Sequence, residues 1–169
     1  MDALSRLNAR PAPEARAELL RCCGSSRWAE TMAGRRPFQD AASLLEAARQ
    51  AWDVLGPADW REAFAHHPRI GDRESLRAHF ANTREWAAGE QAGAATAPED
   101  VLGALAEGNR AYEARFGHIF IVCATGKSAR EMLGLLRDRL GNDAETELRI
   151  AAAEQAKIMR LRLLKLVNP

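Results

Sequence analysis

Residues 40–57 read DAASLLEAARQAWDVLGP, and this stretch carries the signals of an amphipathic helix. Asp40 is a favoured N-cap residue, and Gly56-Pro57 ends one helix and suits the start of the next. Between these signals, apolar side chains recur three and four residues apart, which places them on one helical face. They are Leu44, Leu45, Ala48, Trp52 and Leu55. The stretch therefore predicts a helix that buries one face.

Similar cap, spacing and stop signals recur along most of the chain. They predict further helices that begin near Pro13, Ser25, Pro57, Asp72, Thr83, Pro98, Ser128 and Asn142. Only Ile119 to Ala124 is strand-like, and since no second strand is available we expect an extended buried segment whose backbone groups bond elsewhere. The sequence thus predicts an all-α, single-domain bundle over residues 1–169. It should contain about eight helices and one short extended segment near 119–124.

Composition argues against several classes of function. The 169 residues include 24 Lys and Arg against 23 Asp and Glu, a net charge of +1, so nothing indicates a nucleic-acid or membrane partner. No apolar run approaches the ~20 residues of a membrane span, and the sequence shows neither a signal-peptide core nor a peroxisomal ending. Cys22, Cys23 and Cys123 fit neither a disulfide framework nor a zinc site. We expect a reduced, cytoplasmic protein.

The stretch His66-His67-Pro68-Arg69-Ile70-Gly71-Asp72 combines chemistry with a helix break. Pro68 disfavours the α conformation for the preceding residue, so His67 is expected where a helix has just ended and can point into a cleft. An imidazole with an ordinary pKa of ~6.5 can take or give a proton near neutrality. The alternative is a loop histidine that only caps the preceding helix.

The last predicted helix carries an arginine on its apolar stripe. At about 100° per residue, Arg162 falls on one side of the helix with five other residues. They are Leu148, Ala152, Gln155, Met159 and Leu166. A guanidinium in such a stripe should be paired, because stranding a charge there is costly. Arg162 is therefore either an arginine that snorkels outward or bridges a structural carboxylate, or an anion clamp in a pocket wall.

Glu90 is the candidate carboxylate of the site. It lies four residues after Trp86, on the same face of a predicted helix, while the alternative is a solvated surface glutamate. No paired histidine and carboxylate spacing suggests a metal site. Gly126-Lys127-Ser128 lacks the glycine spacing of a phosphate loop and is interpreted as a turn and a helix cap.

Together these pieces resemble a known family, the OHCU decarboxylases of urate degradation, where OHCU is 2-oxo-4-hydroxy-4-carboxy-5-ureidoimidazoline. The resemblance extends from about Leu4 to Leu166. It is carried, in order, by Cys23-Gly24-Ser25-Ser26-Arg27-Trp28, His67-Pro68-Arg69-Ile70-Gly71-Asp72, Glu90-Gln91, Phe116-Gly117 with Phe120-Ile121-Val122-Cys123, and Leu161-Arg162-Leu163. One position departs from it: Ala87 stands where the family often has a serine.

The resemblance implies an all-helical, cofactor-free and metal-free carboxy-lyase that converts OHCU to (S)-allantoin and carbon dioxide, and that forms a homodimer. It implies that His67 is the catalytic acid/base and that Glu90 works beside it. Implied substrate contacts are Pro68, Ala87, Ala88, Gly89, Glu90, Gln91, Val122, Cys123, Ala124, Thr125, Gly126 and Arg162. A catalytically inactive ligand-binding or regulatory module on the same scaffold is the alternative, and Ala87 is its only support.

Overall fold

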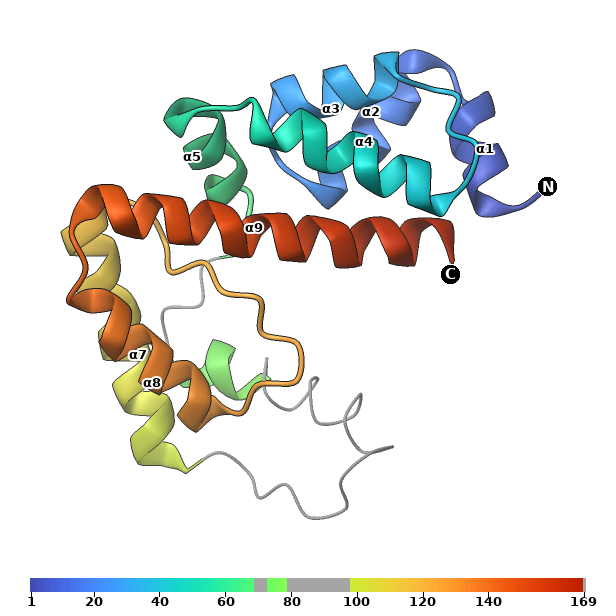
Figure 1. Cartoon of the computed structure of the whole chain (residues 1–169). Coiled ribbons are helices and arrows are strands. Elements are labelled where there is room, and N and C mark those ends of the chain that lie inside the picture. The colour runs from blue at the N-terminus through green and yellow to red at the C-terminus, as the bar shows by residue number, and fades with distance from the viewer. Residues whose placement is uncertain (69–72, 79–97, 169) are drawn as a thin grey trace. The chain divides into compact units, whose positions relative to one another are not determined.

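The computed structural model describes residues 1–68, 73–78 and 98–168, and within these ranges the chain is helical apart from its connections (Figure 1). No described residue lies in a strand, so the all-α prediction is confirmed. Residues 73–78 are helical, and the helix predicted from Thr83 lies outside the described ranges. The labelled helices are α1 (Ala3–Ala9), α2 (Ala12–Cys22), α3 (Ser26–Gly34), α4 (Ala41–Asp53), α5 (Pro57–Ala65), α7 (Glu99–Phe116), α8 (Ala129–Leu140) and α9 (Ala144–Val167).

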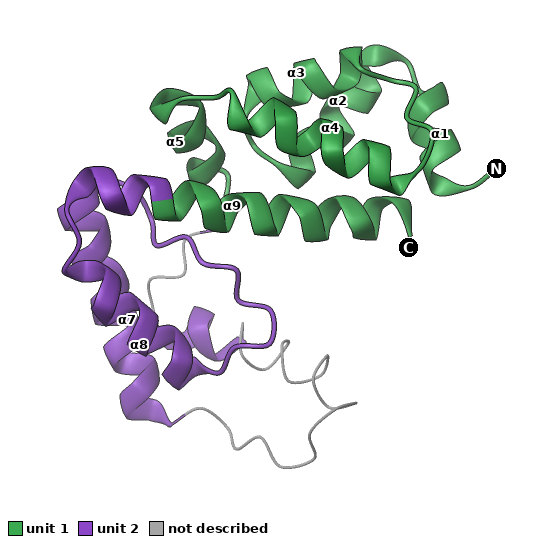
Figure 2. Cartoon of the chain, in the orientation of Figure 1, with its two compact units in different colours: residues 1–67, 150–169 green, residues 68–149 purple. Residues whose placement is uncertain are grey.

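The helices fall into two compact units (Figure 2). Unit 1 comprises residues 1–67 and 150–169, and thus holds α1 to α5 and most of α9. Unit 2 comprises residues 68–149, with α7, α8 and the first turn and a half of α9. The extent of a single functional domain over residues 1–169 stays a prediction.

The helix starts in unit 1 follow the expected capping chemistry. The Ser25 hydroxyl accepts a hydrogen bond from the Trp28 amide at 3.2 Å, which fixes the start of α3. The Asp40 carboxylate accepts one from the Ser43 amide at 2.7 Å and so begins α4. Helix α1 was not predicted; Asp2 caps it, through the Ser5 amide.

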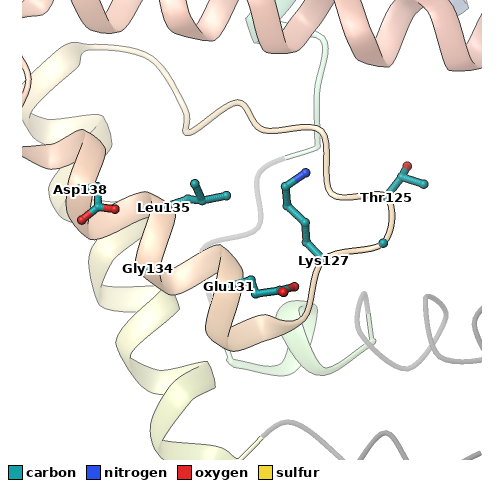
Figure 3. Close-up of a pocket in the computed structure, with 7 residues that line it drawn as sticks. Thr125, Lys127, Glu131, Gly134, Leu135 and Asp138 are labelled. Atoms are coloured by element: carbon teal, nitrogen blue, oxygen red, sulfur yellow. The ribbon is translucent and has the colours of Figure 1, made fainter. Parts of the chain in front are cut away.

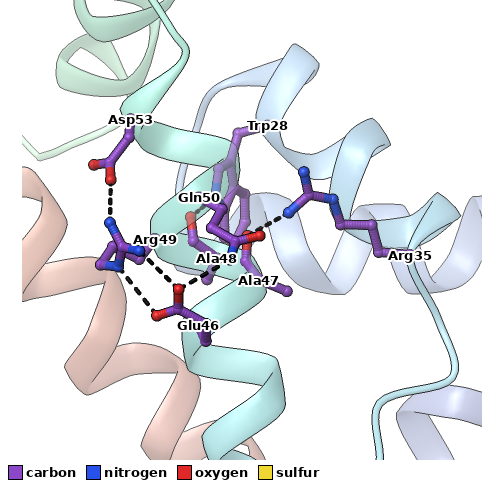
Figure 4. Close-up of polar contacts among 8 residues, drawn as sticks. All are labelled: Trp28, Arg35, Glu46, Ala47, Ala48, Arg49, Gln50 and Asp53. Atoms are coloured by element: carbon purple, nitrogen blue, oxygen red, sulfur yellow. Dashed lines mark hydrogen bonds and ion pairs between the residues drawn. The ribbon is translucent and has the colours of Figure 1, made fainter.

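Two tryptophans join the helices of unit 1 through their indole nitrogens. Trp28 donates to the Ala48 carbonyl at 3.1 Å, and Trp52 donates to the Ala152 carbonyl at 3.2 Å. These bonds connect α3 to α4 and α4 to α9, and both indoles are buried. Figure 4 shows the Trp28 contact beside an exposed ion-pair network on α4, centred on Arg49. Such exposed pairs add little stability, so the buried indoles do more to fix the helix order.

Unit 2 has its own apolar core between α7 and α8, together with residues from the neighbouring segments. The buried members are Leu76, Val101, Leu102, Leu105, Ala106, Tyr112, Ala129, Met132, Leu133 and Leu136. Helix α7 ends at Gly117, whose φ of 75° lies in the left-handed region that glycine adopts easily. Helix α8 begins at the cap expected from Ser128. The cap is a capping box, in which Ser128 and Glu131 bond each other's backbone amides.

Residues 119–124 have no regular secondary structure, as predicted, and several of their carbonyls accept hydrogen bonds from side chains or within a turn. The Ile121 carbonyl accepts a hydrogen bond from Arg139 Nη1 at 2.7 Å. The Cys123 carbonyl accepts one from Lys127 Nζ at 2.9 Å, and the Lys127 amide donates to the Ala124 carbonyl at 3.0 Å. An extended segment is tolerated in this helical protein because these donors replace a neighbouring strand.

The Arg139 cluster consists of Arg139, Glu147, Tyr112 and Asn142, and it is the buried ionic centre of unit 2. Arg139 Nε donates to Glu147 Oε1 at 2.7 Å, and Asn142 Nδ2 donates to Glu147 Oε2 at 3.0 Å. The Tyr112 hydroxyl and Arg139 Nη2 also donate to Glu147 Oε1. Burial and the bonded Glu147 carboxylate raise the pKa of the Tyr112 phenol, so it stays protonated. The cluster therefore holds α7, α8 and α9 to the extended segment.

The buried face of α9 differs from the predicted stripe at its C-terminal end. Leu148, Ala152, Gln155 and Met159 are buried as predicted, but Leu163 and Val167 are buried in place of Arg162 and Leu166. Buried positions spaced four residues apart advance about 40° per step, so the buried face winds around the helix and leaves Arg162 at its margin. The expected cap also moves by one residue, because Asp143, not Asn142, bonds the Thr146 amide at 2.9 Å.

Within the described parts of the chain, no helix combines the length and apolar character needed to cross a membrane.

Candidate active site

His67 stands directly after the end of α5. The helix ends at Ala65, and the amides of His66 and His67 still donate to the Ala63 and Phe64 carbonyls in a last tight turn. Pro68 follows and cannot continue the helical bonding, which is the break expected from the sequence. His67 is half-buried while His66 is exposed, so the two adjacent imidazoles have different surroundings.

The imidazole of His67 is bonded from α9. His67 Nε2 lies 2.5 Å from Gln155 Oε1, across 88 residues of sequence. Burial lowers the pKa of His67 below its ordinary 6.5, and the positive charges of Arg162 and His66 lower it further, while the Gln155 hydrogen bond acts in the opposite direction. The ring is therefore neutral at neutral pH and can accept a proton.

Gln155 is wholly buried, and the described residues satisfy only part of its amide. Its oxygen contacts His67, but its Nε2 atom has no hydrogen-bond partner among the residues described. Leaving a buried amide N–H unpaired opposes folding by about 1–3 kcal/mol. Within the described ranges nothing offsets this cost at position 155.

Arg162 lies seven residues beyond Gln155, which places the two side chains on the same side of α9. It is half-buried, and its Nη1 donates a long 3.4 Å hydrogen bond to the Arg21 carbonyl. Within the described ranges no carboxylate forms an ion pair with it, so the structural-bridge interpretation finds no partner there. The His67 cluster comprises His67, Gln155 and Arg162. It thus combines a neutral imidazole with a guanidinium whose N–H donors are mostly unbonded among the described residues.

Gly24 gives His66 the space it occupies. A Cβ added at Gly24 would lie 2.4 Å from the His66 Cβ and Cγ atoms, far closer than such atoms approach. The following Ser26 is bonded from α5, because its hydroxyl donates to a Glu62 carboxylate oxygen at 2.6 Å and its amide to the other at 3.1 Å. The stretch from Cys23 to Trp28 therefore packs closely against the end of α5 that carries the two histidines.

The predicted contacts Val122, Cys123, Ala124, Thr125 and Gly126 lie on the extended segment and turn of unit 2. Cys123 is buried, Val122 and Ala124 are half-buried, and Thr125 and Gly126 are exposed. The last two border an open hollow of about 500 Å³, shown in Figure 3, whose other lining residues are Lys127, Glu131, Gly134, Leu135 and Asp138. Gly126 adopts a φ of 75°, so the turn that exposes this backbone suits glycine.

The thiols of Cys22 and Cys23 are unreactive in this fold. Both are buried, and burial raises the pKa of Cys22 to about 11 and that of Cys23 to about 12. Neither forms a thiolate at neutral pH. Among the described residues, no group of three or more His, Cys, Asp or Glu side chains could hold a metal ion.

Several predicted site residues lie outside the described ranges. They are Ala87, Ala88, Gly89, Glu90 and Gln91. Pro68 is described and exposed, directly after His67. The structure thus brings His67 and Arg162 into one cluster within unit 1, and the role of Glu90 stays a prediction.

A family model described as OHCU decarboxylase matches residues 8–164. The chain belongs to this family. Among OHCU decarboxylase relatives, the chain is 33% identical over 137 residues to 2-oxo-4-hydroxy-4-carboxy-5-ureidoimidazoline decarboxylase of Amia calva, with 79% of this chain and 75% of that protein covered. It is 39% identical over 148 residues to the uric acid degradation bifunctional protein TTL of Arabidopsis thaliana. That match covers 87% of this chain and 45% of the bifunctional protein, so the chain spans less than half of that relative's length.

A solved structure of an OHCU decarboxylase, determined in the presence of (S)-allantoin, has the same fold. It aligns with a TM-score of 0.72 and 36% identity, covering 90% of this chain and 98% of the other. The resemblance to the OHCU decarboxylase family that was inferred from the motifs is therefore confirmed.

One residue of the cluster was not recognised from the sequence. Gln155 stood in the predicted apolar stripe, but its pairing with His67 joins positions 88 residues apart. A polar residue at a core position of a long helix was the available signal.

Proposed function

We propose that the chain catalyses the cofactor-independent decarboxylation of OHCU to (S)-allantoin and carbon dioxide in urate degradation. The observation that carries this proposal is a neutral imidazole, half-buried beside an arginine without a carboxylate partner among the described residues, in a chain of the OHCU decarboxylase family. An acid/base group beside a cation suits a substrate that carries both a carboxylate and a hydroxyl.

The substrate supplies its own electron sink. When the bond between the ring carbon and the carboxylate breaks, carbon dioxide leaves and the electron pair forms a C=C bond. The π pair of the neighbouring C=N bond then moves onto its nitrogen, which takes up a proton from solvent. The resulting enol becomes a ketone when its hydroxyl loses a proton and the carbon that bears the ureido group gains one. The chain must therefore hold the leaving carboxylate out of the ring plane and deliver that second proton to a single face.

His67 is the proposed acid/base. A neutral ring can take the hydroxyl proton and return a proton to carbon, so no net proton is consumed between the enol and the ketone. Its lowered pKa favours the neutral form at the start of the cycle. Proton transfer of this kind typically contributes ~10²–10⁴ in rate.

Arg162 is the proposed clamp for an anionic or carbonyl oxygen of the substrate. A guanidinium has five N–H donors in a fixed fork, and within the described ranges the long bond to the Arg21 carbonyl is the one hydrogen bond that engages them. Glu90 is proposed to orient the substrate hydroxyl or ureido group. The amides of Val122 to Gly126 are proposed to bind ring oxygens, and the exposure of Thr125 and Gly126 is compatible with this role.

A cytoplasmic homodimer is also proposed. The three cysteines are buried and none forms a disulfide among the described residues, which suits a reducing compartment, and the homodimer follows from the family resemblance. Light scattering coupled to size exclusion tests the dimer, and a molar mass near the monomer's 18.6 kDa would contradict it.

Circular dichroism decides whether the chain is an enzyme. OHCU is generated from urate in place, the protein is added, and the optical activity of the allantoin is followed over time. Spontaneous decay gives racemic allantoin, so an excess of the (S) enantiomer that grows with protein concentration supports the decarboxylase. Racemic product at every concentration favours the alternative, an inactive module on the same scaffold, for which the comparisons give no support.

A further inference from the structure

We propose that Gln155 is the positioning residue of His67: it holds the neutral imidazole in the tautomer with hydrogen on Nε2 and leaves Nδ1 as the basic atom. The inference rests on the proposed function, since it assigns the proton-accepting atom of the proposed acid/base. It concerns a residue of α9 for which neither the motifs nor the resemblance implied a role.

The contact itself indicates the tautomer. Gln155 Oε1 lies 2.5 Å from His67 Nε2, and an amide oxygen can only accept a hydrogen bond. The hydrogen therefore resides on Nε2, and in a neutral ring the lone pair is then on Nδ1. Among the described residues none hydrogen-bonds Nδ1, and the proposal assigns this lone pair to the substrate.

The state of the Gln155 amide argues that the contact serves the histidine and not the core. Gln155 is 0% exposed and its Nε2 atom is buried without a partner among the described residues. An apolar residue of similar length would fill the same space without an unpaired N–H, and would be the better choice for stability. Within the described ranges, the one hydrogen bond that the side chain makes is the bond to His67.

The surrounding charges explain why an amide suits this position. Arg162 and His66 both disfavour a positive charge on His67, whereas the Gln155 oxygen favours it, and burial outweighs that single bond. A carboxylate at position 155 would stabilise the imidazolium far more strongly and would hold the proton. A neutral acceptor orients the ring without trapping it in the charged form.

The tautomer is measured first on the unmodified chain. In protein labelled with ¹⁵N at histidine, the shifts of the two His67 ring nitrogens report which one carries hydrogen, and His67→Asn assigns the signals among the four histidines. We expect a protonated Nε2 and an unprotonated Nδ1 above the ring's pKa. The reverse pattern overturns the inference, because the Gln155 amide would then be turned with its nitrogen toward the ring.

Variants at position 155 then test the consequence. Gln155→Met keeps the length and removes the acceptor, and should lower kcat about 10- to 100-fold with little change in KM, the range typical of residues that orient a histidine from behind. Gln155→Glu should keep the Nε2–H tautomer and move the acid limb of the pH profile upward. Met159→Leu, one turn along the same buried face, is the matched control and should change neither kcat nor the acid limb of the pH profile. A folded Gln155→Met protein with normal kcat and an unchanged tautomer refutes the positioning role.

The two proposals fail in different ways. Racemic allantoin from a protein whose His67 shows the Nε2–H tautomer would reject the decarboxylase and leave the Gln155 assignment standing. An (S) excess from a protein with the opposite tautomer would do the reverse.

Discussion

Glu147 and Gln155 are both completely buried and both project from α9, yet their side chains differ in the number of hydrogen bonds that the described residues make with them. In the Arg139 cluster of unit 2, Glu147 accepts hydrogen bonds from Tyr112, Arg139 and Asn142. In the His67 cluster of unit 1 and within the described ranges, the Gln155 oxygen bonds His67 and its amide nitrogen has no partner. A buried polar group that stabilises the fold has its hydrogen-bonding atoms paired within the protein. A buried polar group with a role in catalysis can keep an unpaired atom.

The strongest test of this difference removes His67. His67→Asn should abolish the enantiomeric excess and lower turnover by ~10²–10⁴, because the proposed acid/base is lost, while the helical circular dichroism is retained. The residue follows the end of α5 and contributes little to any helix, which is why the fold should survive. His66→Asn is the control and should be far less sensitive, since His66 is exposed. Near-normal turnover by His67→Asn would remove His67 from the mechanism.

Substitution in the Arg139 cluster should lower the stability of the fold. Arg139→Met leaves Glu147 buried without its cation, and breaking such a pair typically costs about 3–5 kcal/mol. For a chain of this size the melting temperature should fall by roughly 10 °C. Arg149→Met removes an arginine from an exposed pair with Glu145 and should leave the melting temperature nearly unchanged. Equal melting temperatures for the two variants would show that the buried pair is not a stabilising centre.

A substitution of Arg162 tests whether this residue acts in catalysis, like His67, or in stability, like Arg139. Arg162→Lys keeps the charge and loses the planar fork, so we expect about a 10- to 100-fold loss of kcat/KM with an unchanged melting temperature. Arg160→Lys, at an exposed position of the same helix, should be tolerated. Should Arg162→Lys instead lower the melting temperature while the folded fraction keeps its activity, Arg162 belongs with the structural arginines.

The smallest expected effect is a shift of the acid limb of the kcat/KM–pH profile to lower pH. Burial and the charge of Arg162 lower the pKa of His67, so the neutral base persists below pH 6.5. As pH falls, kcat/KM should therefore decline with a midpoint below 6.5, and stability linked to His67 should decline over the same window because the unfolded chain protonates first. A pH–rate profile from pH 4 to 8 locates the midpoint, and a value above 6.5 would contradict the burial argument.

Local signals were sufficient for much of the fold. Ser25, Asp40 and Ser128 cap helices where capping chemistry predicted, and Pro68 ends α5 as its ring requires. Helix α1 was missed because only seven residues form it, too few to show a periodicity.

Long-range pairing set the limit of prediction. The stripe on α9 placed Arg162 in the core because an ideal straight pattern was assumed, whereas packing winds the buried face toward Leu163. Among the described residues the buried arginine is Arg139, whose partner Glu147 is eight residues away on another helix and follows no helical spacing. Gln155 was visible as a polar residue in an apolar face, but its partner His67 could be found only in space.

The three buried cysteines can report how often different parts of the protein open. Cys22 and Cys23 lie in unit 1 and Cys123 in unit 2, each at most 8% exposed. A thiol reagent can reach such sulfur atoms only when the surrounding helices open, so the rate of labelling measures the frequency of opening at each place. Comparison of the rates at Cys23 and Cys123 in the native chain would therefore show whether the surroundings of His67 and the extended segment of unit 2 open as one event or separately.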